Sequence, residues 1–115
     1  MEITKSQIKP GVFVLTLTGR IFMGQDCHRI RQEIEQHIGR NENRFIFDLS
    51  GAHYIDSAAV GEIVRCFTKL AKCGGALRLA GAKGMVEGAF KLTQVDRVIG
   101  MYPTALEASE SFPGA

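Results

Sequence analysis

Residues 45–61 read FIFDLSGAHYIDSAAVG, and this stretch decides how the chain folds. It begins inside a short, strongly apolar segment, Arg44 to Leu49, which Asn-Glu-Asn precedes and Ser50-Gly51 follows. Such a segment is typical of a central strand that is buried on both faces. Ser50 to Ile55 follows as a predicted loop, and Asp56-Ser57 then opens a helix.

Downstream of this stretch, the apolar residues of 57–72 recur at helical spacing, and Gly74-Gly75 ends the predicted helix. Residues 76–80 predict a short strand. Residues 84–92 predict a third helix, and 98–102 a final edge strand. Pro103 suits the first turn of a last helix over 103–111. The third helix is expected to turn four side chains inward: Met85, Val86, Ala89 and Phe90.

Upstream, residues 1–8 predict a first strand, and Pro10-Gly11 is a turn signal. Residues 12–18 alternate in polarity with a period of two, which predicts a second strand that forms a hairpin with the first. From Gln25 the period changes to that of an amphipathic helix, which is expected to stop at Gly39. Its apolar positions are Cys27, Ile30, Ile34 and Ile38.

The resulting order, β-β-α-β-α-β-α-β-α, predicts an α/β fold: a mixed β-sheet with helices packed on it. Ile34 and Phe47 are expected in its core. The chain has 115 residues without repeats or linkers, so a single domain over 1–115 is expected.

The composition excludes several classes of function. Apolar residues make up 45% and charged residues 23%, as in ordinary globular proteins. The net charge is +2 with scattered Lys and Arg, so no nucleic-acid partner is expected. No apolar run approaches the roughly 20 residues of a membrane span, so no membrane insertion is expected. Three cysteines without C-x-x-C spacing are expected to be free thiols in a reducing cytoplasm.

Side chains that would indicate an enzyme are not found in useful patterns. His28, His37 and His53 lack partners at metal-ligand spacing, and the two on the first helix are expected to be solvated. The segment 81–84, GAKG, lacks the further glycines of a phosphate loop. Ser57 is not part of a G-x-S-x-G nucleophile motif. No catalytic residue, cofactor or metal is therefore expected, and the protein is not expected to be an enzyme.

Asp56 and Ser57 have two interpretations. Both residue types are preferred helix N-caps, and capping alone explains them. Alternatively, Ser57 is a phosphoacceptor, because a phosphate brings about −1.5 to −2 charges to a helix end that favours anions. A partner protein bound over that helix would be repelled, while the fold would tolerate the charge.

At these residues the chain resembles the anti-sigma-factor-antagonist family, the STAS domain. That family's signature, Asp-Ser-Ser/Thr-Gly-Leu-Gly, is similar to residues 56–61, DSAAVG. Four other segments, in the right order, are similar to family motifs: 17–21 (LTGRI), 74–79 (GGALRL), 92–99 (LTQVDRVI) and 105–108 (ALEA).

The resemblance implies a STAS-type mixed sheet and a partner-switching regulator of the cytoplasm. Such a protein binds an anti-sigma factor, often itself a serine kinase, and phosphorylation of a serine switches it. By resemblance, Ser57 is the phosphorylation site, and four residues bind the partner: Asp56, Ser57, Ala58 and Phe22. The oligomeric state, including a homodimer, is left open.

Two departures from the family pattern keep an alternative open. Ala58 and Ala59 replace a hydroxyl residue and a glycine, and Phe22 stands where the family usually has an acidic residue. They favour a STAS module of another assembly: a stressosome-like scaffold or the small cytosolic subunit of a lipid-transport ABC system. A receiver domain would need an acidic pair beside Asp48, which the sequence lacks.

Overall fold

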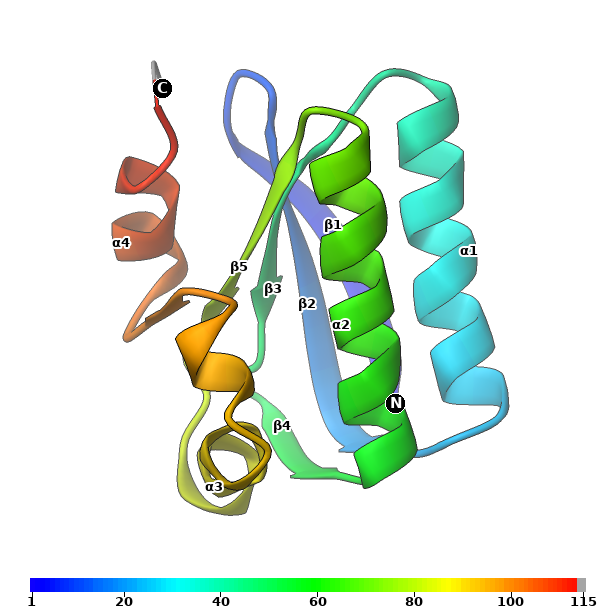
Figure 1. Cartoon of the computed structure of the whole chain (residues 1–115), viewed down its shortest axis with the longest axis vertical. Helices are drawn as coiled ribbons and strands as arrows, with labels where there is room; N and C mark the ends of the chain where they lie inside the picture. Colours follow the sequence, from blue (N-terminus) through cyan, green and yellow to red (C-terminus); the bar gives the residue numbers. More distant parts are fainter. Residues whose placement is uncertain (114–115) are drawn as a thin grey trace.

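The computed structural model describes residues 1–113 and contains a six-stranded sheet with helices on both faces (Figure 1). The strands are β1 (Glu2–Lys9), β2 (Val12–Ile21), β3 (Arg44–Asp48), β4 (Ala52–Ile55), β5 (Ala76–Ala80) and β6 (Met101–Tyr102). The helices are α1 (Gln25–Gly39), α2 (Ser57–Lys72), α3 (Gly84–Leu92), α4 (Ala105–Glu110) and a 3₁₀ turn, Val95–Arg97. The predicted mixed α/β architecture is confirmed.

The sheet has the order β1-β2-β3-β5-β6. The predicted hairpin is confirmed, because β1 pairs antiparallel with β2 and Ile3 lies opposite Leu17. The pairs β2–β3, β3–β5 and β5–β6 are parallel. Their carboxyl ends therefore point to one end of the molecule, where loops can bring functional side chains together.

The prediction of a loop over Ser50 to Ile55 is wrong, because Ala52–Ile55 forms β4. This short strand pairs parallel with the last residues of β2, Gly19 to Ile21. Gly19 has a φ of +89°, a conformation that favours glycine, and its N–H donates to the Gly51 carbonyl at 2.9 Å. Before this irregularity β2 pairs with β3, and after it β2 pairs with β4. Because the pairing with β4 extends the strand to Ile21, β2 is longer than the predicted 12–18.

The last predicted strand is also shorter than expected. Only Met101–Tyr102 pairs at the sheet edge, with Leu79 and Ala80 of β5. The residues before it form the 3₁₀ turn Val95–Arg97, whose carbonyl at Val95 accepts from Val98 and Ile99. Because those amides are used locally, they are not available for a sheet ladder.

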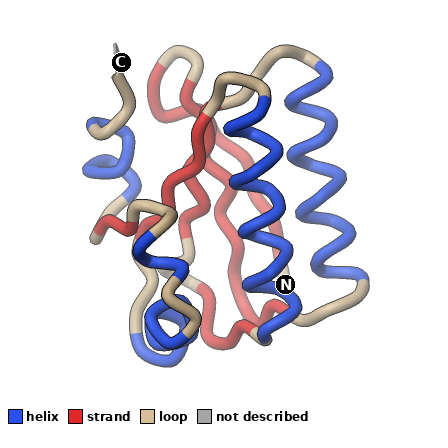
Figure 2. The backbone as a smooth tube through the Cα atoms, in the orientation of Figure 1, coloured by secondary structure: helices blue, strands red, loops and turns tan. Residues whose placement is uncertain are grey.

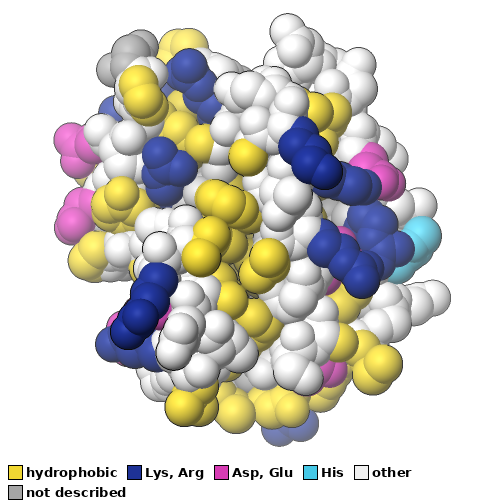
Figure 3. All heavy atoms as spheres, viewed as in Figure 1, with side chains coloured by type: hydrophobic (Ala, Val, Ile, Leu, Met, Phe, Trp, Pro, Cys, Tyr) yellow, Lys and Arg dark blue, Asp and Glu magenta, His cyan; other side chains and the backbone are white. Residues whose placement is uncertain are grey.

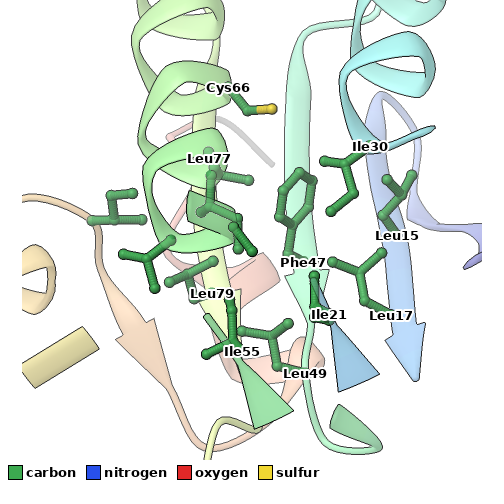
Figure 4. Packing of buried hydrophobic residues seen from close by; sticks show 14 of the residues in the cluster. Leu15, Leu17, Ile21, Ile30, Phe47, Leu49, Ile55, Cys66, Leu77 and Leu79 are labelled. Atoms are coloured by element: carbon green, nitrogen blue, oxygen red, sulfur yellow. The ribbon is translucent and has the colours of Figure 1, made fainter. Parts of the chain in front are cut away.

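The core lies on both faces of the sheet. The larger part packs under α1, α2 and α3, and Ile34 and Phe47 are fully buried there as predicted. Figure 4 shows Phe47 among the buried side chains of this cluster. On the opposite face, Val14 and Ile46 pack against Ala108 and Phe112 at the end of the chain. Figure 2 shows α1 and α2 side by side on one face of the strands, with α4 apart from them.

Within residues 1–113, none of the helices combines the length and the apolar character that a membrane crossing requires.

Candidate functional site

The site is built where β2 and β4 end side by side. Ile21 and Ile55 are in register, and the Asp56 N–H donates to the Ile21 carbonyl at 3.2 Å. The two residues that follow these strands, Phe22 and Asp56, are therefore brought to the same end of the sheet. The strand that sequence reasoning missed is the element that joins them.

Asp56 fixes the geometry of the site with both carboxylate oxygens. It is the N-cap of α2, and its Oδ1 accepts from the Ala59 N–H at 2.8 Å. Its Oδ2 accepts from the Met23 N–H at 2.9 Å, in the loop between β2 and α1. The capping interpretation is confirmed for Asp56, which also ties that loop to the start of α2.

Ser57 is the first residue of α2, and both Ser57 and Ala58 are exposed. The free amides and the positive end of the helix dipole lie at this end of the helix. A solvent-facing hydroxyl at the start of α2, as the sequence predicted, is confirmed.

Phe22 lies on the same surface, as expected from its place at the end of β2. Its side chain is 43% exposed, its N–H donates to Asp26 Oδ2 at 2.9 Å, and its ring centroid lies 5.3 Å from that of Tyr54. Met23 beside it is 68% exposed. The carboxylate that the family usually has at position 22 is replaced by the aromatic side chain of Phe22.

The expected inward orientation of Met85 is wrong, since this side chain is 55% exposed. Val86 and Phe90 are fully buried and Ala89 is partly buried, as predicted. The nine-residue helix α3 packs mainly on β4, so only one of its sides is covered. Met85 shares a surface hollow with Phe22 and Tyr54.

A second hollow lies between the first halves of α1 and α2. Its wall includes an ion pair between the partly exposed Arg31 and the buried Glu62, in which Arg31 donates to Glu62 at 2.6 Å and 3.4 Å. The hydrogen bond to Glu62 raises the pKa of the Arg31 guanidinium. Because Glu62 is only 4% exposed, this pair fixes the spacing of the two helices next to Ser57. Sequence reasoning missed it, since Arg31 and Glu62 are far apart in the chain.

Two thiols lie beneath this region. Burial, together with the Glu62 carboxylate, raises the pKa of the Cys66 thiol to about 12. Burial also raises the pKa of Cys27, and the Glu62 carboxylate adds to the effect. All three cysteines are free, as predicted, and only Cys73 is exposed. Cys27 and Cys66 are therefore protonated packing residues and not nucleophiles.

The solvent exposure of one histidine differs from the prediction. His28 and His53 are exposed, but His37 is buried, so its predicted solvation is wrong. Its Nδ1 lies 2.8 Å from Glu42 Oε1, and its ring packs edge-on against Phe45. Among residues 1–113, no three His, Cys, Asp or Glu side chains are grouped so as to hold a metal ion.

A family model described as "STAS domain" matches residues 4–108. The chain belongs to the STAS domain family. The family resemblance inferred from the sequence is thereby confirmed.

Known STAS proteins resemble this one over most of its length. A Thermotoga maritima protein named "Putative anti-sigma factor antagonist" is 30% identical over 87 residues, which cover 75% of this chain and 77% of that protein. The crystal structure of a protein from that organism, also named a putative anti-sigma factor antagonist, has a TM-score of 0.85 at 24% identity, covering 94% of this chain and 92% of that one. SpoIIAA of Bacillus, in its phosphorylated form, has a TM-score of 0.75 at 18% identity, covering 95% and 97%. At such identities the two structures show the shared fold.

Proposed function

We propose that this STAS domain, spanning 1–115, is an anti-sigma factor antagonist. In this proposal it binds an anti-sigma factor of the serine-kinase type in the cytoplasm, and phosphorylation of Ser57 switches the binding off. The observation that carries the proposal is the exposed Ser57 hydroxyl directly after the capping Asp56, at the start of α2. The names of the Thermotoga relative and of phosphorylated SpoIIAA support it.

The start of α2 suits a phosphate physically. The helix dipole and the free amides favour an anion there, so the modified protein remains folded. Ser57 lies outside the two hydrogen bonds that Asp56 makes, and a phosphate on it leaves that cap in place. The added charge then acts on whatever protein covers Ala58 and Phe22.

The alanines at 58 and 59 are compatible with this arrangement. Asp56 uses the backbone N–H of Ala59, which every residue but proline provides. Of the two replacements, only Ala58 is exposed and changes the surface that a partner meets, because Ala59 is fully buried. The position of Ser57 is kept.

Mass spectrometry tests the proposal. The purified protein is incubated with ATP and a candidate serine kinase of the anti-sigma factor type, and its intact mass is measured. We expect the addition of one phosphate to the wild type and none to Ser57→Ala. An unmodified wild-type protein, or a phosphate that persists in Ser57→Ala, would contradict the proposal.

A second candidate is a STAS module of another assembly, either a stressosome-like scaffold or the small subunit of a lipid-transport ABC system. The exposed aromatic side chain of Phe22 favours it, because the family's acidic residue is absent. Stable co-purification with an ABC ATPase, independent of the phosphorylation of Ser57, would support this candidate against the first.

A further inference from the structure

Apolar side chains are exposed together beside Ser57. Phe22 is 43%, Met23 68% and Met85 55% exposed, and Tyr54 is partly exposed next to Phe22. We call these four residues the Phe22 surface. Figure 3 shows hydrophobic side chains gathered at the end of the molecule where α3, β4 and the start of α2 lie. Methionine and aromatic side chains of this kind are enriched at protein interfaces and adapt to a partner's shape.

The charges around the Phe22 surface are mainly basic. Its two hollows are lined by three arginines, Arg20, Arg31 and Arg65, of which Arg20 and Arg65 are exposed. The hollows contain one carboxylate, Glu62, which is buried and paired with Arg31. Lys83 lies two residues before Met85 and is also exposed.

The neighbouring acidic side chains are already engaged with the backbone. Asp56 accepts from the N–H groups of Met23 and Ala59, and Asp26 accepts from that of Phe22. Both carboxylates lie at helix starts, where the dipole offsets part of their charge. The ion pairs among the described residues include neither Arg20 nor Arg65, so these two exposed side chains are available to a ligand.

We infer that the segment bound at the Phe22 surface is an acidic protein segment carrying an apolar anchor. The anchor packs among Phe22, Tyr54 and Met85, and flanking carboxylates face Arg20 and Arg65. The inference rests on the proposed function for the role of Ser57, and it adds the chemistry of the partner. With Phe22 in place of the family's acidic residue, this surface has one negative charge fewer, which makes it more favourable for an acidic partner.

The shape of α2 agrees with this partner. Ala58 and Gly61 line the hollow beside Met23, and a Cβ added at Gly61 would meet no atom within 4 Å. The helix surface is therefore low between Ser57 and Arg65, which lets a partner's backbone approach closely. Ser57, Gly61 and Arg65 are spaced by four residues and share one helix face. A phosphate on Ser57 would compete with the partner's carboxylates for the same basic side chains.

Peptide titration tests the inference on the whole, unphosphorylated protein. The first probe is a short synthetic peptide with leucines among glutamates; the second replaces each glutamate with lysine, and the third replaces each leucine with alanine. NMR spectra of the ¹⁵N-labelled protein locate the binding. We expect only the first peptide to bind, with shifts centred on Met23, Ala58 and Met85. Absence of binding by the first peptide, or equal binding by the lysine peptide, overturns the inference.

Charge reversal supplies the matched control. Arg65→Glu is expected to weaken binding of the first peptide about fivefold. Lys72→Glu makes the same change in charge at the far end of α2, and we expect it to have little effect. An equal loss in both variants would indicate general electrostatic attraction and overturn the inference. Binding of phosphatidylserine vesicles at the Phe22 surface in place of the peptide would also overturn it, because the ligand would be a membrane.

The two proposals fail separately. The peptide experiment needs neither ATP nor a kinase, and the mass measurement does not involve the peptide. An unphosphorylated Ser57 together with specific binding of the acidic peptide would refute the proposed switch and leave the surface assignment intact.

Discussion

At the scale of single residues, Asp56 is the side chain on which the site depends most. One oxygen caps α2 and the other holds Met23, so a single carboxylate joins two segments that are 33 residues apart. Sequence reasoning identified the cap, because Asp before a helix is a local signal. It did not identify the bond to Met23, because that contact depends on the pairing of β2 with β4.

Substitution of Asp56 therefore removes two hydrogen bonds. We expect Asp56→Ala to lower the free energy of unfolding by about 1–3 kcal/mol, as the cap and the bond to Met23 each contribute on the order of 1 kcal/mol. Asp56→Asn keeps a capping oxygen and loses an acceptor, so its effect should be intermediate. Urea denaturation of the three proteins measures this order. An unchanged midpoint for Asp56→Ala would contradict the role of the carboxylate.

Cys66 gives a prediction about pH. Burial raises the pKa of its thiol from the ordinary value of 9.0 to about 12, so the folded protein keeps this proton at pH values where the unfolded chain releases it. Unfolding then becomes more favourable as the pH rises from about 9 towards 12, and the stability that this thiol contributes is lost over that range.

Measurement of stability at pH 8 and pH 10 tests this linkage. The decrease in unfolding free energy between the two pH values should be smaller in Cys66→Ala than in the wild type. Cys73→Ala alters an exposed thiol and should behave as the wild type. A decrease of the same size in all three proteins would show that Cys66 does not contribute.

At the scale of elements, the sequence predicted most of the fold. The bounds of α2, β5 and α3 are as expected, because each has a clear apolar period and a glycine or polar signal at its ends. β4 escaped prediction because its four residues, AHYI, are too few to establish a period. Its existence depends on the distant residues Gly19 to Ile21, and such non-local pairing overrides local patterns.

Surface positions were harder to predict than buried ones. Met85 matches the apolar period of α3, yet the helix covers only the side that carries Val86 and Phe90. An apolar residue at the margin of a helix face is buried or exposed according to what packs beside it. The exposed residues Phe22 and Ser57 could therefore be predicted from the sequence, whereas the exposure of Met85 and the pairing of Arg31 with the buried Glu62 could not.

The packing of α1 on β3 gives a prediction for elements. Ile34 in α1 and Phe47 in β3 are fully buried in the same core. We expect Ile34→Ala and Phe47→Ala each to cost about 2–5 kcal/mol of stability, because both leave a cavity. Thermal or urea unfolding measures the cost. Leu92→Ala, at a side chain that is 88% exposed, is the control and should change stability little. Unchanged unfolding of both core variants would refute the core assignment.

At the scale of the whole molecule, the sheet and the site have separate tasks. The parallel strands and their two layers of helices form the core. The Phe22 surface and Ser57 lie at one end, on helix starts, on the loop after β2 and on the short strand β4. STAS proteins at 18–30% identity share the frame. The family therefore accounts for the fold, and the partner of this chain is a matter of the exposed residues at this end, among them Phe22.

This separation predicts that Ser57→Asp changes binding without unfolding the protein. An anion at the start of α2 is favoured by the helix dipole, so the midpoint of thermal unfolding should remain close to that of the wild type. Amide exchange in β3 and β5 should also be unchanged, whereas affinity for the anti-sigma partner, or for the acidic peptide, should fall. Ser57→Asn, similar in size but neutral, distinguishes charge from bulk and should retain more of the binding. If Ser57→Asp instead lost much of its thermal stability, the start of α2 would be part of the folded core, and a phosphate there would act by unfolding the domain.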